Sequence, residues 1–93
     1  MFEWDHGKAR TNLQKHGVSF DEAATVFEDP LAAILPDHAH SHSEVREIIV
    51  GYSITERLLV VTFTERENGT LGIVSARMAA QKERHAHETY RKG

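Results

Sequence analysis

Cysteine is absent from this 93-residue sequence, and so is any long apolar run. Without thiols the chain forms no disulfide bond and performs no thiolate chemistry, which is typical of proteins in a reducing compartment. No apolar stretch approaches the roughly 18 residues that a membrane-spanning helix needs. Charged residues also stand near Met1, where a secretory signal would need apolar ones. We therefore expect a cytoplasmic protein that has no membrane partner.

A surplus of positive charge is also missing. Eleven Lys and Arg residues stand against fourteen Asp and Glu residues, which gives a formal net charge of −3. Nucleic-acid-binding proteins usually carry a positive balance, so any RNA site must be a local cluster of cations on an acidic body. The length and the ordinary 40% hydrophobic content predict a single folded domain over residues 1–93.

The N-terminal part of the chain carries clear helix signals. A short strand is predicted over Phe2–Trp4, and Asp5 is a good N-cap for a helix that Gly17 ends. The expected apolar stripe of this helix consists of Ala9, Leu13 and His16. A capping box at Ser19–Glu22 then opens a second helix, which Asp29-Pro30 ends.

The rest of the chain predicts a sheet followed by a helix. The expected strands are Leu31–Leu35, Glu44–Tyr52, Leu58–Arg66 and Thr70–Arg77, and the final helix runs from Ala79 to about Arg91. Together these elements predict an α+β fold with two N-terminal helices, an antiparallel sheet of about four strands and a C-terminal helix. We expect the helices to pack against one face of the sheet.

A two-residue turn at Asn68-Gly69 would fix which side chains share a face of the last hairpin. The face left open to solvent would carry Leu58, Val60, Thr62, Thr64, Arg66, Leu71, Ile73, Ser75 and Arg77. The face under the helices would carry Leu59, Val61, Phe63, Gly72, Val74 and Ala76. If Tyr52 pairs with Leu58 in the preceding hairpin, Arg46 comes opposite Thr64 and next to Arg66. The open face is polar and basic at both ends, so we expect the substrate there.

Six short motifs follow one another along the chain. They are FEWD at Phe2–Asp5 with Lys8 and Asn12, KHGVSFDEA at Lys15–Ala23, FEDP at Phe27–Pro30, HSEVRE at His42–Glu47, LVVTFTER at Leu59–Arg66, and IVSAR at Ile73–Arg77 with Glu83-Arg84. In order and spacing, these motifs resemble the BrnT-type ribonuclease toxins of bacterial toxin–antitoxin pairs. The resemblance implies a RelE-like fold, RNA cleavage and inhibition of translation. It also implies a BrnA-like ribbon-helix-helix antitoxin as partner, with operator DNA bound only through that antitoxin.

RNA cleavage without a metal needs a base for the 2′-hydroxyl proton, cations for the phosphorane, and an acid for the leaving oxygen. Arginine suits the second role because its planar guanidinium binds phosphate through two hydrogen bonds. The family pattern and the predicted open face together favour Lys8, Arg66 and Arg77 as catalytic residues, and we expect no cofactor. Arg66 and Arg77 would lie roughly 20 Å apart along the hairpin, so we expect only one of them at the scissile phosphate.

Three further residues, Arg46, Lys15 and His16, are candidates for RNA binding. Histidine suits acid–base chemistry because imidazole titrates near neutral pH, but His16 also falls on the apolar stripe and could be structural. Lys8 could equally be a solvated helix residue. The strand-end arginines could form surface ion pairs, for which Glu44 is the obvious partner.

The chain departs from the family after the SAR motif. Further basic residues usually follow there, whereas Met78 and Gln81 are neutral. This departure favours an alternative: a weak or inactive homologue that acts as a binding module in an antitoxin–operator autorepressor complex. Alternating histidines at His38, His40 and His42 leave a third hypothesis, a metal-binding protein, but we expect no metal site because no cysteine or fixed carboxylate accompanies them.

Overall fold

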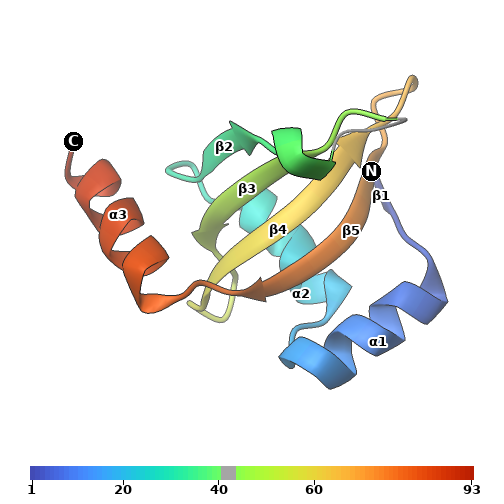
Figure 1. Cartoon of the computed structure of the whole chain (residues 1–93), viewed down its shortest axis with the longest axis horizontal. Helices are drawn as coiled ribbons and strands as arrows, with labels where there is room; N and C mark the ends of the chain where they lie inside the picture. The colour runs from blue at the N-terminus through green and yellow to red at the C-terminus, as the bar shows by residue number, and fades with distance from the viewer. Residues whose placement is uncertain (41–43) are drawn as a thin grey trace.

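The computed structural model describes residues 1–40 and 44–93, which form a five-stranded sheet flanked by helices (Figure 1). Its elements are β1 (Phe2–Glu3), α1 (His6–His16), α2 (Phe20–Thr25), the 3-10 helix η1 (Val26–Glu28), β2 (Ala33–Pro36), the 3-10 helix η2 (His38–His40), β3 (Glu47–Tyr52), β4 (Leu58–Glu65), β5 (Leu71–Met78) and α3 (Gln81–Lys92). The predicted order of elements is confirmed.

The sheet has the strand order β1-β5-β4-β3-β2. β1 runs parallel to β5, whereas the other neighbouring strands are antiparallel. The α+β class is confirmed, but the expected antiparallel sheet of about four strands differs in detail, because the sheet has five strands and β1 is parallel to its neighbour. The two-residue β1 joins the sheet because the carbonyl of Met1 accepts the N–H of Leu71 at 2.9 Å and the Phe2 ring packs 5.1 Å from the Phe27 ring.

The main core lies between α2 and one face of the sheet. Buried side chains from α2 and its flanks, including Val18, Phe20 and Ala23, meet those of the strands. The strand residues of this core are Ile49, Leu59, Val61, Phe63, Ile73 and Ala76. Among the described residues, no helix is long and apolar enough to cross a lipid bilayer.

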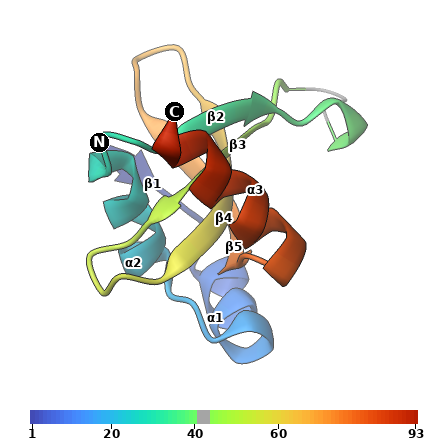
Figure 2. The same cartoon turned by 90° about the vertical axis from the view of Figure 1, so that its left-hand side faces the viewer.

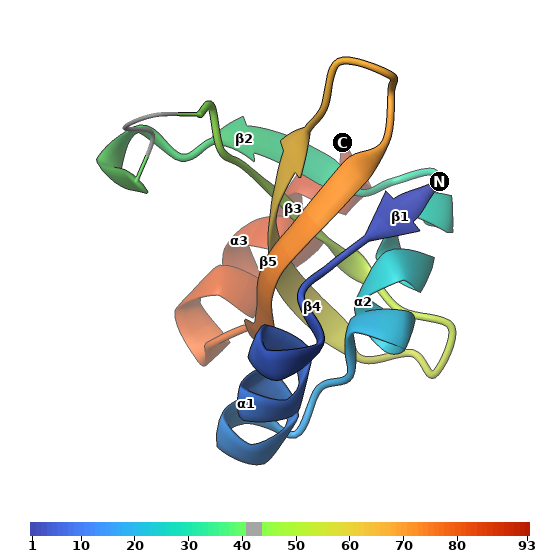
Figure 3. The same cartoon turned by 90° about the vertical axis from the view of Figure 1, so that its right-hand side faces the viewer.

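The C-terminal helix α3 packs on the opposite face, so the expectation that all helices share one face is wrong. Figure 2 and Figure 3 show the sheet between α2 and α3. The physical reason is that β3 and β4 present Ile48, Val50 and Val60 on this second face, and α3 covers part of this apolar surface. An ion pair between Arg91 and Asp29, at 2.8 Å, anchors the end of α3.

Asn12 is the buried residue of α1, and it fixes this helix against β5. The helix begins after the N-cap Asp5 and ends at Gly17, whose φ is +68°, as predicted. Its predicted apolar stripe is partly wrong, because Leu13 is 49% exposed whereas Asn12 is only 6% exposed. The Asn12 amide donates to the carbonyls of Ala76 and Val18 and accepts the Ala76 N–H, at 2.8–3.0 Å. The side chain of Asn12 thus satisfies buried backbone groups of β5 that lie beyond the pairing of this strand with β1.

The last hairpin contains two irregularities that compensate each other. Its loop has three residues, because the Arg66 N–H bonds the Thr70 carbonyl at 2.8 Å and Gly69 adopts a φ of +81°. This loop shifts the register by one residue next to the turn, and an extra residue in β5, Val74, shifts it back.

The predicted pairs far from the turn, Thr62 with Ser75 and Val60 with Arg77, are therefore confirmed. The faces predicted near the turn are wrong. Leu71 and Ile73 pack toward the core, whereas Val74 faces the open side of the sheet.

A charged network holds the β3–β4 loop against α2. Ser19 caps α2 by accepting the Glu22 N–H, as predicted, but the Glu22 carboxylate turns to the Arg57 guanidinium and to the hydroxyls of Ser53 and Thr55. Arg57 also donates to the Gly17 carbonyl at 3.1 Å. Hydrogen bonds from Arg57, against the opposing effect of burial, lower the pKa of Glu22 to about 2.

This network predicts a stability difference that depends on pH. Glu22→Gln is expected to lower the free energy of unfolding at pH 7 by about 1–3 kcal/mol, because the ion pair and its hydrogen bonds are lost. The contribution of Glu22 is present above its unfolded pKa, 4.5, and is lost as the pH falls toward about 2. The free energies of unfolding of the wild type and of Glu22→Gln, measured by urea unfolding, should therefore converge at acidic pH. Glu28→Gln, a change at an exposed residue of η1, is the control and should match the wild type throughout.

Candidate functional site

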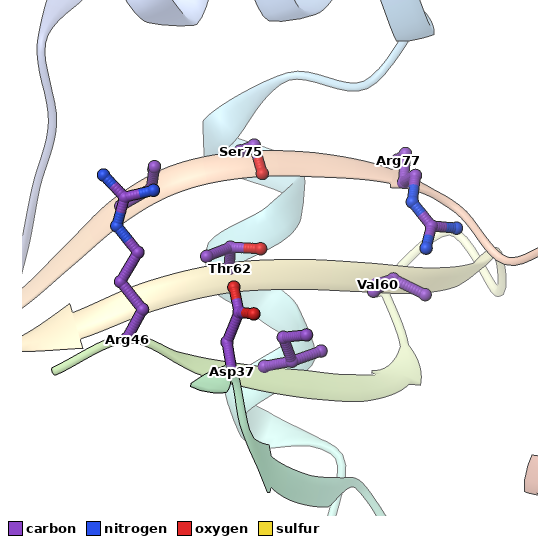
Figure 4. A pocket seen from close by; sticks show the side chains of 8 residues that line it. Asp37, Arg46, Val60, Thr62, Ser75 and Arg77 are labelled. Carbon is purple, nitrogen blue, oxygen red and sulfur yellow. The ribbon is translucent and has the colours of Figure 1, made fainter. Parts of the chain in front are cut away.

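A cavity of about 280 Å³ opens on the face of the sheet that α2 does not cover (Figure 4). Its floor contains Thr62 and Ser75, the predicted cross-strand pair of the open face. The residues that line the cavity are Asp37, Arg46, Ile48, Val60, Thr62, Val74, Ser75 and Arg77. Two guanidinium groups, two hydroxyls and a carboxylate therefore converge on one concave surface, and such a surface suits a phosphate ester with a nearby hydroxyl.

Arg77 reaches this cavity from the end of β5, where the open face meets α3. Its two terminal nitrogens bind both carboxylate oxygens of Glu83, at 2.7 and 2.8 Å, and the side chain is 44% exposed. Glu83 also accepts the Ala80 N–H at the start of α3, at 2.8 Å. The Arg77 hydrogen bonds lower the pKa of Glu83 to about 2, and Glu83 in turn raises the pKa of Arg77. Arg77 is thus an oriented and permanently charged group.

Arg46 lines the same cavity from the residue just before β3. The predicted pairing of Tyr52 with Leu58 is confirmed, and it sets the register of this strand. In Figure 4, Arg46 lies at the end of the cavity away from Arg77, with Ser75 and Asp37 between them. Arg46 therefore shares a cavity with Arg77, whereas the sequence suggested Arg66 as its neighbour.

The candidate RNA-contacting residues of the N-terminal helix line a neighbouring hollow. Lys8, Lys15 and His16 lie along α1 over a shallow space of about 570 Å³. Val74 and Ser75 line both this hollow and the cavity that contains Arg77. Lys8 therefore lines a hollow that adjoins the cavity of Arg77, whereas Arg66 lines neither of these two spaces.

Arg66 lies in a separate hollow near the turn of the last hairpin. Its guanidinium binds Glu3 at 3.2 Å and covers Gly72, where a Cβ atom would come within 2.8 Å of it. Four carboxylates line this hollow together with Arg66 and Asn68, namely those of Glu3, Glu44, Glu65 and Glu67. Arg66 and Arg77 therefore do not share a site, as the spacing predicted, and the surroundings of Arg66 are acidic.

The histidine tract falls only partly within the described residues. His38 and His40 belong to η2, whereas His42 lies outside the described residues. Over residues 1–40 and 44–93, no group of three His, Cys, Asp or Glu side chains could hold a metal ion.

Asp37 is the cavity residue that sequence analysis missed. It follows β2 directly, and its N–H donates to the Arg46 carbonyl at 3.0 Å, which extends the pairing of β2 with β3. Its carboxylate points toward Thr62 in Figure 4. No local pattern distinguishes Asp37 from an ordinary turn aspartate, since only the pairing of β2 with β3 places it beside the two arginines.

Comparisons with known proteins identify the family. Residues 4–83 match the model of the ribonuclease toxin BrnT of type II toxin–antitoxin systems. The fold is similar to a crystal structure of the Brucella abortus ribonuclease toxin BrnT, with a TM-score of 0.68 and 25% sequence identity, over 87% of this chain and 99% of that one. A search of curated proteins gave no significant match. The chain belongs to the BrnT family of ribonuclease toxins of type II toxin–antitoxin systems.

Proposed function

We propose that this protein is an RNA endonuclease that cleaves through the 2′-hydroxyl of its substrate without a metal ion. The cavity that contains Arg46 and Arg77 is the observation that supports this proposal. Two guanidinium groups on one concave surface supply the positive charge that stabilises a phosphorane. In this proposal Arg77 contacts the scissile phosphate and Arg46 holds an adjacent one.

The hollow over α1 provides a path for the RNA strand on either side of the scissile phosphate. Lys8 and Lys15 are exposed on α1, and their hollow meets the cavity at Ser75. These cations form a local positive surface on a chain whose net charge is −3. We assign Lys8 to the catalytic end of this path, and Lys15 and His16 to RNA binding.

Expression of this protein without its antitoxin is expected to slow bacterial growth and to degrade bulk RNA. Arg77→Ala, expressed to the same soluble level, is the matched control and should restore growth. The readouts are the growth curve and the integrity of total RNA. Full growth with intact RNA, at confirmed soluble expression of the wild type, would contradict the nuclease proposal.

Cleavage is expected to continue in EDTA and to leave 2′,3′-cyclic phosphate ends. The reason is that Arg46 and Arg77 supply the charge that a metal ion would otherwise provide. Purified protein and a defined RNA, with end-group analysis of the products, test this expectation. Activity that chelation abolishes and a divalent ion restores would overturn it.

Membership of a type II toxin–antitoxin family implies an antitoxin partner. We propose a BrnA-like ribbon-helix-helix antitoxin, through which the complex would bind operator DNA in the cytoplasm. Co-expression of the two proteins should suppress both toxicity and RNA cleavage.

A second candidate function is a binding module that has lost catalysis. Glu83 forms an ion pair with Arg77, and two neutral, exposed residues lie close to it in the sequence, Met78 at the end of β5 and Gln81 at the start of α3. This arrangement lowers the positive potential at one end of the cavity. Two results together would support this second function over the first. The protein would bind its antitoxin and form a complex with operator DNA in a mobility-shift assay, and it would leave RNA intact at saturating protein concentration.

A further inference from the structure

Asp37 occupies the middle of the cavity. It is half-buried, and its N–H donates to the Arg46 carbonyl at 3.0 Å directly after the last β2–β3 pair, which fixes the place of its backbone. Figure 4 shows its carboxylate directed at Thr62, with Arg46 to one side and Arg77 to the other. The cavity therefore contains a carboxylate between two guanidinium groups.

We propose that Asp37 is the general base of the RNA cleavage reaction, an inference that rests on the proposed nuclease function. A ribose 2′-hydroxyl lies next to the phosphate that it attacks, so its base must sit beside the cations that bind that phosphate. Asp37 meets this requirement because Arg46 and Arg77 line the same cavity.

The reaction balances without a further cofactor. The Asp37 carboxylate takes the proton of the 2′-hydroxyl while the 2′-oxygen forms a bond to phosphorus. The bond between phosphorus and the 5′-oxygen breaks, and the leaving 5′-oxygen takes a proton from water. The products are a 2′,3′-cyclic phosphate and a 5′-hydroxyl, and Asp37 then returns its proton to solvent.

Two other carboxylates, those of Glu83 and Asp5, lie near this cavity but do not line it. Both oxygens of Glu83 bind Arg77, and one of them also accepts the Ala80 N–H. Arg77 thus stabilises the charged form of Glu83, which makes this carboxylate a weak base. Asp5 lines the hollow over α1, where its side chain caps the helix by accepting the Lys8 N–H at 2.8 Å.

The test compares cleavage with binding in Asp37→Asn. The single-turnover rate of RNA cleavage should fall on the order of 10²-fold or more, the usual contribution of a general base. Binding of a 2′-O-methylated RNA, which has no 2′-hydroxyl to attack, should be unchanged or tighter because the variant loses a negative charge. Asp21→Asn is the matched control, since Asp21 is exposed on α2 across the sheet and should keep the wild-type rate.

Each outcome decides a different claim. Wild-type cleavage together with an equally active Asp37→Asn variant would overturn the assignment of Asp37 and leave the nuclease function intact. If Asp37→Asn lost RNA binding and thermal stability to the same extent as cleavage, Asp37 would be a structural residue. This result would also overturn its assignment as the general base. Wild-type protein that leaves RNA intact would overturn the nuclease function and, with it, the role of Asp37.

Discussion

Replacement of Arg77 by alanine is expected to lower the rate of RNA cleavage at saturating RNA by on the order of 10²-fold or more. Glu83 orients the planar guanidinium of Arg77 in the cavity through two hydrogen bonds. Arg77→Lys keeps the positive charge but loses the planar guanidinium, so the cleavage rate of this variant should fall between those of the wild type and Arg77→Ala. Single-turnover kinetics on a short RNA, with circular dichroism to confirm folding, measures the effect.

Arg66→Ala provides the contrast, because Arg66 lies in a separate, acidic hollow at the turn. The Arg66→Ala variant should cleave saturating RNA at nearly the wild-type rate but bind RNA more weakly. The dependence of its RNA affinity on salt concentration should fall by the amount expected for about one phosphate contact. The opposite pattern, a rate defect in Arg66→Ala and an affinity defect in Arg77→Ala, would place the scissile phosphate at the turn end of the sheet.

Asn12→Ala is expected to lower the free energy of unfolding by about 2–4 kcal/mol, because it leaves buried backbone groups of Ala76 and Val18 without partners. Such a loss is large against the total stability of a small domain, about 5–15 kcal/mol. The same change should weaken RNA binding, because α1 carries Lys8 and Lys15 and Asn12 fixes α1 to the sheet.

Urea unfolding measures this effect, and Thr11→Ala, at the exposed neighbour on α1, is the control. Asn12→Asp is a second variant of similar size that cannot donate to the two carbonyls, so it should also destabilise the fold. An Asn12→Ala protein within about 0.5 kcal/mol of the wild type would show that water replaces the amide at little cost.

Local signals predicted much of this fold. The caps at Asp5, Gly17 and Ser19 act between neighbouring residues, so the sequence alone reveals them, and all three are confirmed. The cross-strand pair of Thr62 and Ser75 is also confirmed, because residue alternation propagates along a regular strand.

Features that depend on distant partners were not predictable. The three-residue loop and the extra residue Val74 change which side of the sheet Ile73 faces, and no local pattern distinguishes them from a two-residue turn in a regular hairpin. In the sequence, Asn12 resembles an ordinary surface residue, because its partner Ala76 on β5 lies 64 positions away. Asp37 joins the two arginines only through the pairing of β2 with β3, which the sequence did not specify.

The parallel pairing of β1 with β5 has a consequence for the order of events at the ribosome. Phe2 pairs with Leu71, and Asn12 bonds Ala76, so β1 and α1 must await the synthesis of β5, about 60 to 70 residues later. At typical speeds of translation this wait lasts on the order of several seconds. A nascent chain that has not reached β5 carries Lys8 and Lys15 but neither a docked α1 nor Arg77. Under the proposed mechanism, in which Arg77 contacts the scissile phosphate, such a chain does not yet cleave RNA.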